Sequence, residues 1–224
     1  MVHWVSTRRR LHIQLSSSPT NRSGAGSVNT LNPASTALLV VDLQDDIVSP
    51  GTALGSLCSP EVRSRNILAK CYSAMAAVRG AGGLVVPLRL AFASDSSDLD
   101  PTVPLLQLAK RGRLPKGGQR RLCHRSGDSR PRYGYRSSLL NDVLKSRGIE
   151  NVVVCGVATN ASVEAAVRQA ADLGYKTYVL SDATSAASEA AHQASVASMA
   201  LVARVITLPK LKASLLTVAD KSQQ

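Results

Sequence analysis

Two side chains of chemically useful types, a carboxylate and a hydroxyl, stand near the ends of predicted strands. Asp42 directly follows the apolar run 37–41, and Ser162 follows a sharp turn after the valine run 152–154. Ligands of open α/β sheets bind outside the carboxyl ends of the strands, so we expect both side chains on one rim. A serine hydroxyl is a weak nucleophile unless a general base takes its proton, so catalysis by Ser162 would require such a partner.

The segment 151–181 has the pattern of a strand, a helix and a second strand. Its first part is apolar and β-branched, which is typical of a buried parallel strand. After a glycine-containing turn, apolar residues recur at helical spacing on one face, and opposite charges at i,i+4 spacing occupy another. Asn160 suits the N-cap of this helix and Gly174 the position just after its end. The second strand is predicted at 177–180.

The rest of the chain alternates in the same way. Further strands are predicted at 37–41, 84–90 and 205–208. Further helices are predicted at 60–79, 139–147 and 189–204, with a loop over 91–104 and a short helix over 103–109. Strands that alternate with helices imply a parallel sheet with right-handed crossovers. We therefore expect one doubly wound, Rossmann-like α/β domain with five or six strands.

Composition divides the chain into three parts. Residues 1–33 form a basic, Arg- and Ser-rich extension with no acidic residue, which indicates either disorder or an organelle transit peptide. Residues 34–210 form the α/β domain, and 211–224 are expected to be a C-terminal tail. Apolar residues make up 44% of the chain, enough for a sizeable core. The predicted location is cytoplasmic, with the mitochondrion as the alternative that the extension suggests.

The formal net charge of +12 is unevenly distributed. Residues 110–136 carry ten Lys or Arg against one acid, Asp128, and much of the remainder lies in the N-terminal extension. Within the basic segment only Tyr133 and Tyr135 could stack on bases, so nucleic acid is not an expected partner. The atypical stretch 112–136 has few apolar residues and no regular period, and we expect it to pack poorly.

Cysteine and histidine usage argues against a disulfide framework and against a metal site. The four cysteines form no CxxC pair and have no histidine at ligand spacing, which fits a reducing compartment. We expect no metal and no cofactor. No apolar run reaches the length of a membrane-spanning helix, so a membrane is not an expected partner either.

Two stretches resemble a known family. GVATNASVEAAVRQAADLGYKTYVLSDA is similar to the signature of the isochorismatase-like cysteine hydrolases, and ALLVVDLQDDIVSPG resembles their first strand. The resemblance covers about 37–209. It implies an isochorismatase-like α/β fold and hydrolysis of an amide or enol-ether bond in a small molecule by an Asp–Lys–Cys constellation. It also implies a cis peptide bond between Val157 and Ala158.

The resemblance assigns roles to individual positions. It places the catalytic Asp at Asp42 and puts Ser162 where the family has its Cys nucleophile. The Lys position holds Arg130, which stays protonated and cannot shuttle a proton. The binding residues that it implies are Gln44, Ala158, Thr159, Asn160 and Arg130. Because the triad is incomplete, we expect weak activity; the alternative is a non-catalytic relative that binds a small molecule or a protein partner. The sequence leaves a homo-oligomer open.

Each assignment has a structural alternative. Asp42 could simply hydrogen-bond the loop that follows it, and Ser162 could be an ordinary serine at a helix start. Capping of the helix is the default interpretation of Thr159 and Asn160.

Two further reactive side chains are predicted to be structural. Cys155 ends an apolar strand, so we interpret it as a buried thiol rather than a replacement nucleophile. His192, within a predicted helix, is interpreted as a core or surface residue. The D-x-H…H metal set of nicotinamidases has no counterpart after the second strand, which argues against a zinc or iron nicotinamidase.

Overall fold

The computed structural model describes residues 30–52, 54–90, 102–104, 107 and 138–219 of the 224-residue chain. In this part of the chain five strands form one sheet in the order β2-β1-β3-β4-β5, and every neighbouring pair is parallel. The strands are β1 (Thr36–Val41), β2 (Leu84–Leu88), β3 (Asn151–Val157), β4 (Lys176–Ser185) and β5 (Arg204–Ile206). The predicted parallel, doubly wound α/β sheet is confirmed.

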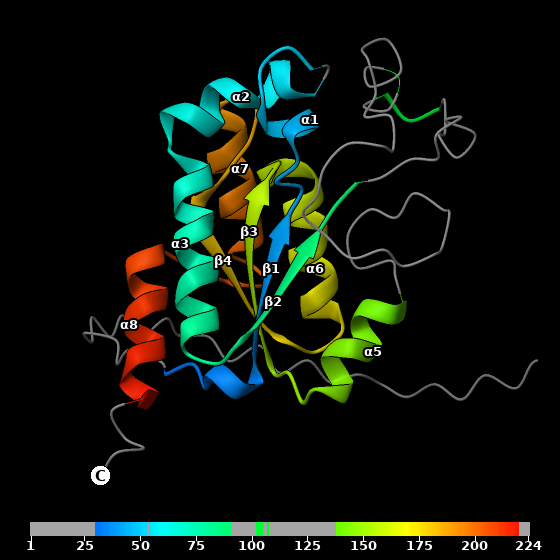
Figure 1. Ribbon diagram of the computed structural model, residues 1–224. Coiled ribbons are helices and arrows are strands. Elements are labelled where there is room, and N and C mark those ends of the chain that lie inside the picture. The colour runs from blue at the N-terminus through cyan, green and yellow to red at the C-terminus, as the bar shows by residue number, and fades with distance from the viewer. Residues whose placement is uncertain (1–29, 53, 91–101, 105–106, 108–137, 220–224) are drawn as a thin grey trace, which may run out of the picture.

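Helices cover both faces of the sheet. They are α1 (Asp45–Val48), α2 (Gly55–Ser64), α3 (Ile67–Gly80), α5 (Ser138–Ser146), α6 (Glu164–Asp172), α7 (Glu189–Met199) and α8 (Leu208–Ala219). Figure 1 shows α3 and α8 on one face and α5 and α6 on the other. An apolar core lies on each face of the sheet, and successive residues of β1 point into them alternately. Leu38 and Val40 pack with α3, and Leu39 and Val41 pack with α6. Both cores are mainly aliphatic.

The strand order reverses between β1 and β3. The chain after β1 crosses to β2 on one side, whereas β3 continues the sheet on the other side. Such a switch point opens a crevice at the carboxyl ends of the two central strands. The register pairs Val41 with Gly156 there, so Asp42 and the turn that follows β3 emerge next to each other. The arrowheads of β1 and β3 point to this end in Figure 1, where α1 also lies.

Gly156 permits this close approach of the central strands. Its φ is +119°, and a Cβ built on it would lie 2.0 Å from the Val41 carbonyl oxygen. A side chain at this position would push β1 away from β3. Glycine is required here both by backbone conformation and by space.

The helix predicted over 60–79 is two helices. α2 ends at Ser64 and α3 begins at Ile67, because Asn66 adopts a left-handed conformation with φ +54°. Arg65 lies in this break, and its side chain turns inward to contact β4 and α7. The apolar pattern of the sequence did not indicate this break, because apolar residues recur at helical spacing on both sides of it.

Part of the segment expected as a C-terminal tail forms a helix. Residues 208–219 form α8, which packs on α3 and buries Leu211 and Leu215 in the core. The Leu31 N–H donates to the Ser214 carbonyl oxygen (3.2 Å), which joins both ends of the described chain. The apolar residues at i,i+4 spacing explain why this segment packs.

Smaller differences concern element ends. β4 continues to Ser185, past a register shift opposite Val154–Gly156, whereas α7 ends at Met199. The predicted loop over 91–104, the short helix over 103–109 and the atypical stretch 112–136 lie wholly or largely outside the described residues, as does the N-terminal extension.

The close approach at Gly156 can be tested against a glycine with open surroundings. We expect Gly156→Ala to lower the free energy of unfolding by about 4 kcal/mol or more, because backbone must move. Gly174→Ala, at φ +87° with nothing within 4 Å of its Cβ, should cost only about 1 kcal/mol. Urea denaturation measures both. Equal losses of unfolding free energy in the two variants would show that the pairing of β1 with β3 does not depend on the close approach at Gly156.

The docking of α8 gives a second stability prediction. Leu211→Ala should lower the free energy of unfolding by about 2–5 kcal/mol, because the fully buried side chain leaves a cavity. Lys212→Ala, on the exposed side of the same helix, should change it by less than about 0.5 kcal/mol. Similar effects of the two substitutions would contradict the packing of α8.

Candidate active site

Asp42 is a buried carboxylate at the centre of the rim. It follows β1 with φ +51°, and only 6% of its surface is exposed. Its backbone N–H donates to the Leu88 carbonyl oxygen (2.9 Å), which fixes it between β1 and β2. Burial raises the pKa of its carboxyl from 3.8 to about 6, and hydrogen bonds from the Ser162 hydroxyl and the Leu90 N–H oppose this rise. The structure therefore brings Asp42 and Ser162 into contact.

Ser162 lies in an unusual turn. The Val157–Ala158 peptide is cis, as the family resemblance implied, and Thr159–Val163 then forms one π-helical turn, η3, before α6 begins. The Ala158 carbonyl oxygen accepts the N–H groups of Ala161 (3.1 Å) and Val163 (3.2 Å). A helix offers no internal acceptor for the N–H groups of its first turn. Because the Ala158 carbonyl oxygen occupies the N–H groups of Ala161 and Val163, an oxyanion beside Ser162 would depend on the other N–H groups of this turn.

The predicted capping roles are wrong. Asn160 lies inside the π turn at φ −87° and ψ 15°, and neither end of the turn has a side-chain cap. Widening of the first turn moves the helix start beyond Asn160, whose exposed side chain stays available to solvent or a ligand. Thr159 is fully buried, and its hydroxyl lies 2.9 Å from His192 Nδ1.

Gln44 binds backbone with both ends of its amide. Its Nε2 donates to the Leu90 carbonyl oxygen (2.8 Å), and its Oε1 accepts the Leu90 N–H (2.7 Å). The same N–H also contacts Asp42. Gln44 thus joins the loops that follow β1 and β2, and it orients the Leu90 N–H toward Asp42. Any part that Gln44 takes in binding would therefore act through Leu90.

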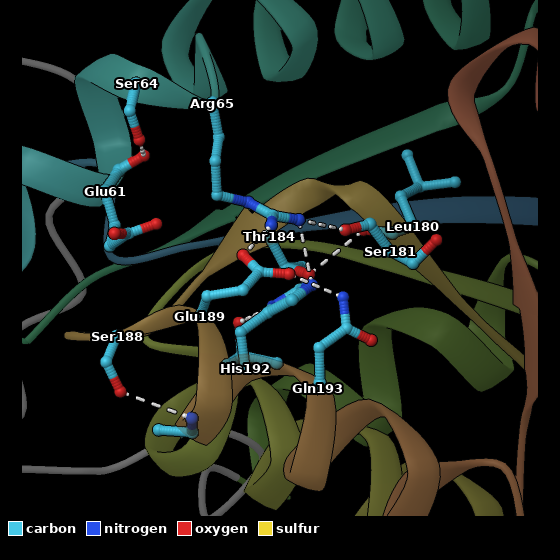
Figure 2. Close-up of polar contacts among 12 residues, drawn as sticks. Glu61, Ser64, Arg65, Leu180, Ser181, Thr184, Ser188, Glu189, His192 and Gln193 are labelled. Carbon is cyan, nitrogen blue, oxygen red and sulfur yellow. Dashed lines mark hydrogen bonds and ion pairs between the residues drawn. The ribbon is translucent and has the colours of Figure 1, made fainter.

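His192 is a core residue with two polar contacts. It is 1% exposed on α7, with Nδ1 at Thr159 and Nε2 at 2.9 Å from Arg65 Nη2. Figure 2 shows Arg65 pointing toward His192, Glu189 and Ser181. Sequence reasoning missed Arg65 because it stood in the middle of a predicted helix. The run of four polar residues at 63–66 was the available signal for a break there.

Cys155 is a structural thiol, as predicted. It is fully buried, and a hydrogen bond with Cys71, together with burial, raises the pKa of its thiol well above the usual value. Cys71 Sγ in turn donates to the Ala183 carbonyl oxygen (3.3 Å). A raised pKa keeps the thiol protonated and unreactive.

The remaining predicted site residue is Arg130, which lies outside the described residues. Across the described part of the chain, no three His, Cys, Asp or Glu side chains gather into a group that could hold a metal ion. No helix in that part is long and apolar enough to cross a membrane.

Comparison with known proteins agrees with this arrangement. The family model of the isochorismatase domain matches residues 36–210. The chain belongs to the isochorismatase family. The resemblance predicted from the sequence is thereby confirmed, and it spans both Asp42 and the turn that carries Ser162.

Several solved structures share the fold. A cysteine hydrolase from Pseudomonas syringae pv. phaseolicola 1448A is 24% identical with a TM-score of 0.68, over 84% of this chain and 95% of that one. An isochorismatase family protein from Burkholderia thailandensis is 26% identical with a TM-score of 0.60, over 84% and 99%. A pyrazinamidase of Pyrococcus horikoshii, solved in complex with zinc, is 21% identical with a TM-score of 0.58, over 77% and 99%.

The burial of Asp42 gives a pH-dependent stability prediction. Its pKa is higher in the folded protein than in the unfolded chain, so the folded state binds the proton more tightly and this group makes stability fall as pH rises from about 4 to 6. Asp42→Asn removes that cost and tolerates the left-handed backbone. We expect it to raise the free energy of unfolding by about 1–3 kcal/mol at pH 8 and by almost nothing below about pH 4.

The exposed Asp45→Asn is the matched control, and urea denaturation at several pH values measures both variants. A gain for Asp42→Asn that does not depend on pH would contradict the burial of an ionised carboxylate.

Proposed function

We propose that this protein is a slow hydrolase of an amide C–N bond or an enol ether in a small molecule, and that Asp42 and Ser162 do its chemistry. The observation that carries the proposal is the Ser162 hydroxyl beside the buried Asp42 carboxylate, where it acts as a hydrogen-bond donor that lowers the carboxyl pKa. The two groups meet at the switch point of the sheet, where α/β proteins bind ligands. Membership of the isochorismatase family supports the reaction class.

For an amide, the reaction runs in two halves. Asp42 accepts the proton of Ser162 as Oγ forms a bond to the carbonyl carbon, and N–H groups at the start of the turn 159–163 donate to the oxyanion. Protonated Asp42 then gives its proton to the leaving nitrogen as the C–N bond breaks. In the second half Asp42 takes a proton from water, which attacks the ester, and the returning proton restores the Ser162 hydroxyl as the acid leaves.

The pKa of about 6 suits Asp42 to this double role. The carboxylate is mostly ionised at neutral pH and can act as a base, yet it holds a proton more readily than an exposed Asp does. The expected rate therefore falls as pH drops below about 6, where Asp42 becomes protonated and can no longer accept the proton of Ser162.

Two features make the proposed enzyme slow. A hydroxyl is much less acidic than a thiol, so the helix N-terminus alone does not ionise Ser162. Arg130, at the family's Lys position, can hold an anion but cannot donate or accept the proton that a Lys exchanges. These same replacements support the second candidate, a non-catalytic relative that binds a small molecule in the same crevice.

A six-variant assay separates these possibilities. A panel of small amides and enol ethers is incubated with wild type, Asp42→Asn, Ser162→Ala, Ser162→Cys, Arg130→Lys, the double variant Ser162→Cys with Arg130→Lys, and the control Asp45→Asn. We expect slow wild-type turnover, a loss of about 100-fold or more in Asp42→Asn, and little gain from either single restoration. The double variant should exceed the product of the single effects, because catalytic groups that act as a unit are strongly non-additive.

Three results would change the account. Fast wild-type turnover that Ser162→Ala abolishes would make the chain an efficient serine-dependent hydrolase and refute the slow rate. Turnover that survives Asp42→Asn would remove Asp42 from the mechanism. Binding of a panel member without turnover in any variant would favour the non-catalytic relative.

A further inference from the structure

A chain of polar contacts runs from the surface to the turn that carries Ser162. Arg65 pairs through Nη1 with Glu189, which is half exposed on α7. Its Nη2 donates to the Ser181 carbonyl oxygen (3.0 Å) and lies 2.9 Å from His192 Nε2. His192 Nδ1 in turn lies 2.9 Å from Thr159 Oγ1 (Figure 2 shows the Arg65, Glu189 and His192 part).

These contacts fix the proton on His192. A guanidinium has only donors, so the imidazole nitrogen beside Arg65 must accept and carries no hydrogen. The single proton of the neutral ring therefore sits on Nδ1, which donates to Thr159 Oγ1. Burial, together with the positive charge of Arg65, lowers the pKa of His192 and keeps the ring neutral.

Helix α7 holds the active-site turn at both of its ends. At the start of the turn, His192 binds the Thr159 hydroxyl, and Ser195 Oγ donates to the Thr159 carbonyl oxygen (3.0 Å). At the far end, the same hydroxyl shares its one proton with the carboxylate of Glu164, the first residue of α6, at 2.6 Å. Ser162 lies between these two anchors, and the Asp42–Ser162 hydrogen bond depends on where they place it.

We propose that Arg65 and His192 are positioning residues for the active-site turn: Arg65 fixes His192 as the Nδ1–H tautomer, and His192 holds Thr159 so that Ser162 stays on Asp42. The importance of these contacts for catalysis rests on the function proposed above, but the contacts themselves can be tested without any turnover. The break between α2 and α3 then has a purpose, because it directs Arg65 inward.

We expect low pH to protonate His192 and so to break its contact with Arg65. The groups that face the His192 ring are Arg65 from the α2–α3 link, Glu189 from α7, Thr159 from η3 and the Ser181 carbonyl from β4. A protonated ring carries N–H groups on both nitrogens, so Nε2 can no longer accept from Arg65. The two cations then repel, and Nε2–H competes for the Ser181 carbonyl that Arg65 holds.

The pKa of Asp42, read by carboxyl ¹³C NMR on the full chain, reports whether Ser162 stays in place. The Ser162 hydrogen bond lowers that pKa, so any variant that displaces the turn should raise it, by about half to one unit. We expect this rise in Arg65→Met and His192→Leu, equal to the rise in Ser162→Ala. His192→Asn, whose amide N–H can replace Nδ1–H, should keep the wild-type value.

Lys176→Met is the control, since it removes an exposed ion pair with Glu150 at the opposite end of the sheet. ¹⁵N NMR of the wild-type imidazole should show the Nδ1–H tautomer at pH 7.5. The Nε2–H tautomer would overturn the proposal even if no variant folds. An unchanged Asp42 pKa in folded Arg65→Met and His192→Leu would overturn it too. Neither measurement needs turnover, so failure here and failure of the hydrolase proposal are distinguishable.

Discussion

The close parallel pairing of β1 with β3 is the constraint on which the rest of the structure depends. It is possible because Gly156 has no side chain and takes a backbone conformation with positive φ beside Val41. The approach places the end of β1 against the turn after β3, and it does so where the strand order reverses. Asp42 is consequently buried, and its pKa is raised. Burying this carboxylate costs stability, and the same burial would give the proposed hydrolase a base with a pKa near neutral pH.

The second requirement for the site is that the turn 159–163, which follows β3, keeps its position. Within the turn, two N–H groups donate to the Ala158 carbonyl oxygen, and the Glu164 N–H contacts the Ala161 and Thr159 carbonyl oxygens. Neighbouring elements add further contacts. Helix α7 supplies these through His192 and Ser195, and the α2–α3 break supplies Arg65 behind them. Elements distant in sequence thus determine the position of one serine hydroxyl.

Sequence patterns predicted most of this arrangement. The β-branched runs and helical spacing located β1, β3 and α6, and the switch-point rule correctly placed Asp42 and Ser162 on one rim. The patterns failed where tertiary contacts override local periodicity. The apolar spacing of 60–79 continued smoothly across Asn66, so the inward turn of Arg65 was invisible. Asn160 has the residue type of an N-cap, but the π turn displaced the helix start. The segment 211–219 was too short and too far from a motif to be recognised as core, although Leu211 and Leu215 are buried.

The central claim is that a buried Asp42 carboxylate and the Ser162 hydroxyl form one functional pair. The most direct test is the titration of the Asp42 carboxyl by ¹³C NMR in wild type and in Ser162→Ala. The account predicts a pKa of about 6 in wild type, set by burial, and a higher value once the Ser162 hydrogen bond is removed. A wild-type pKa near that of an exposed Asp, with no response to Ser162→Ala, would contradict it.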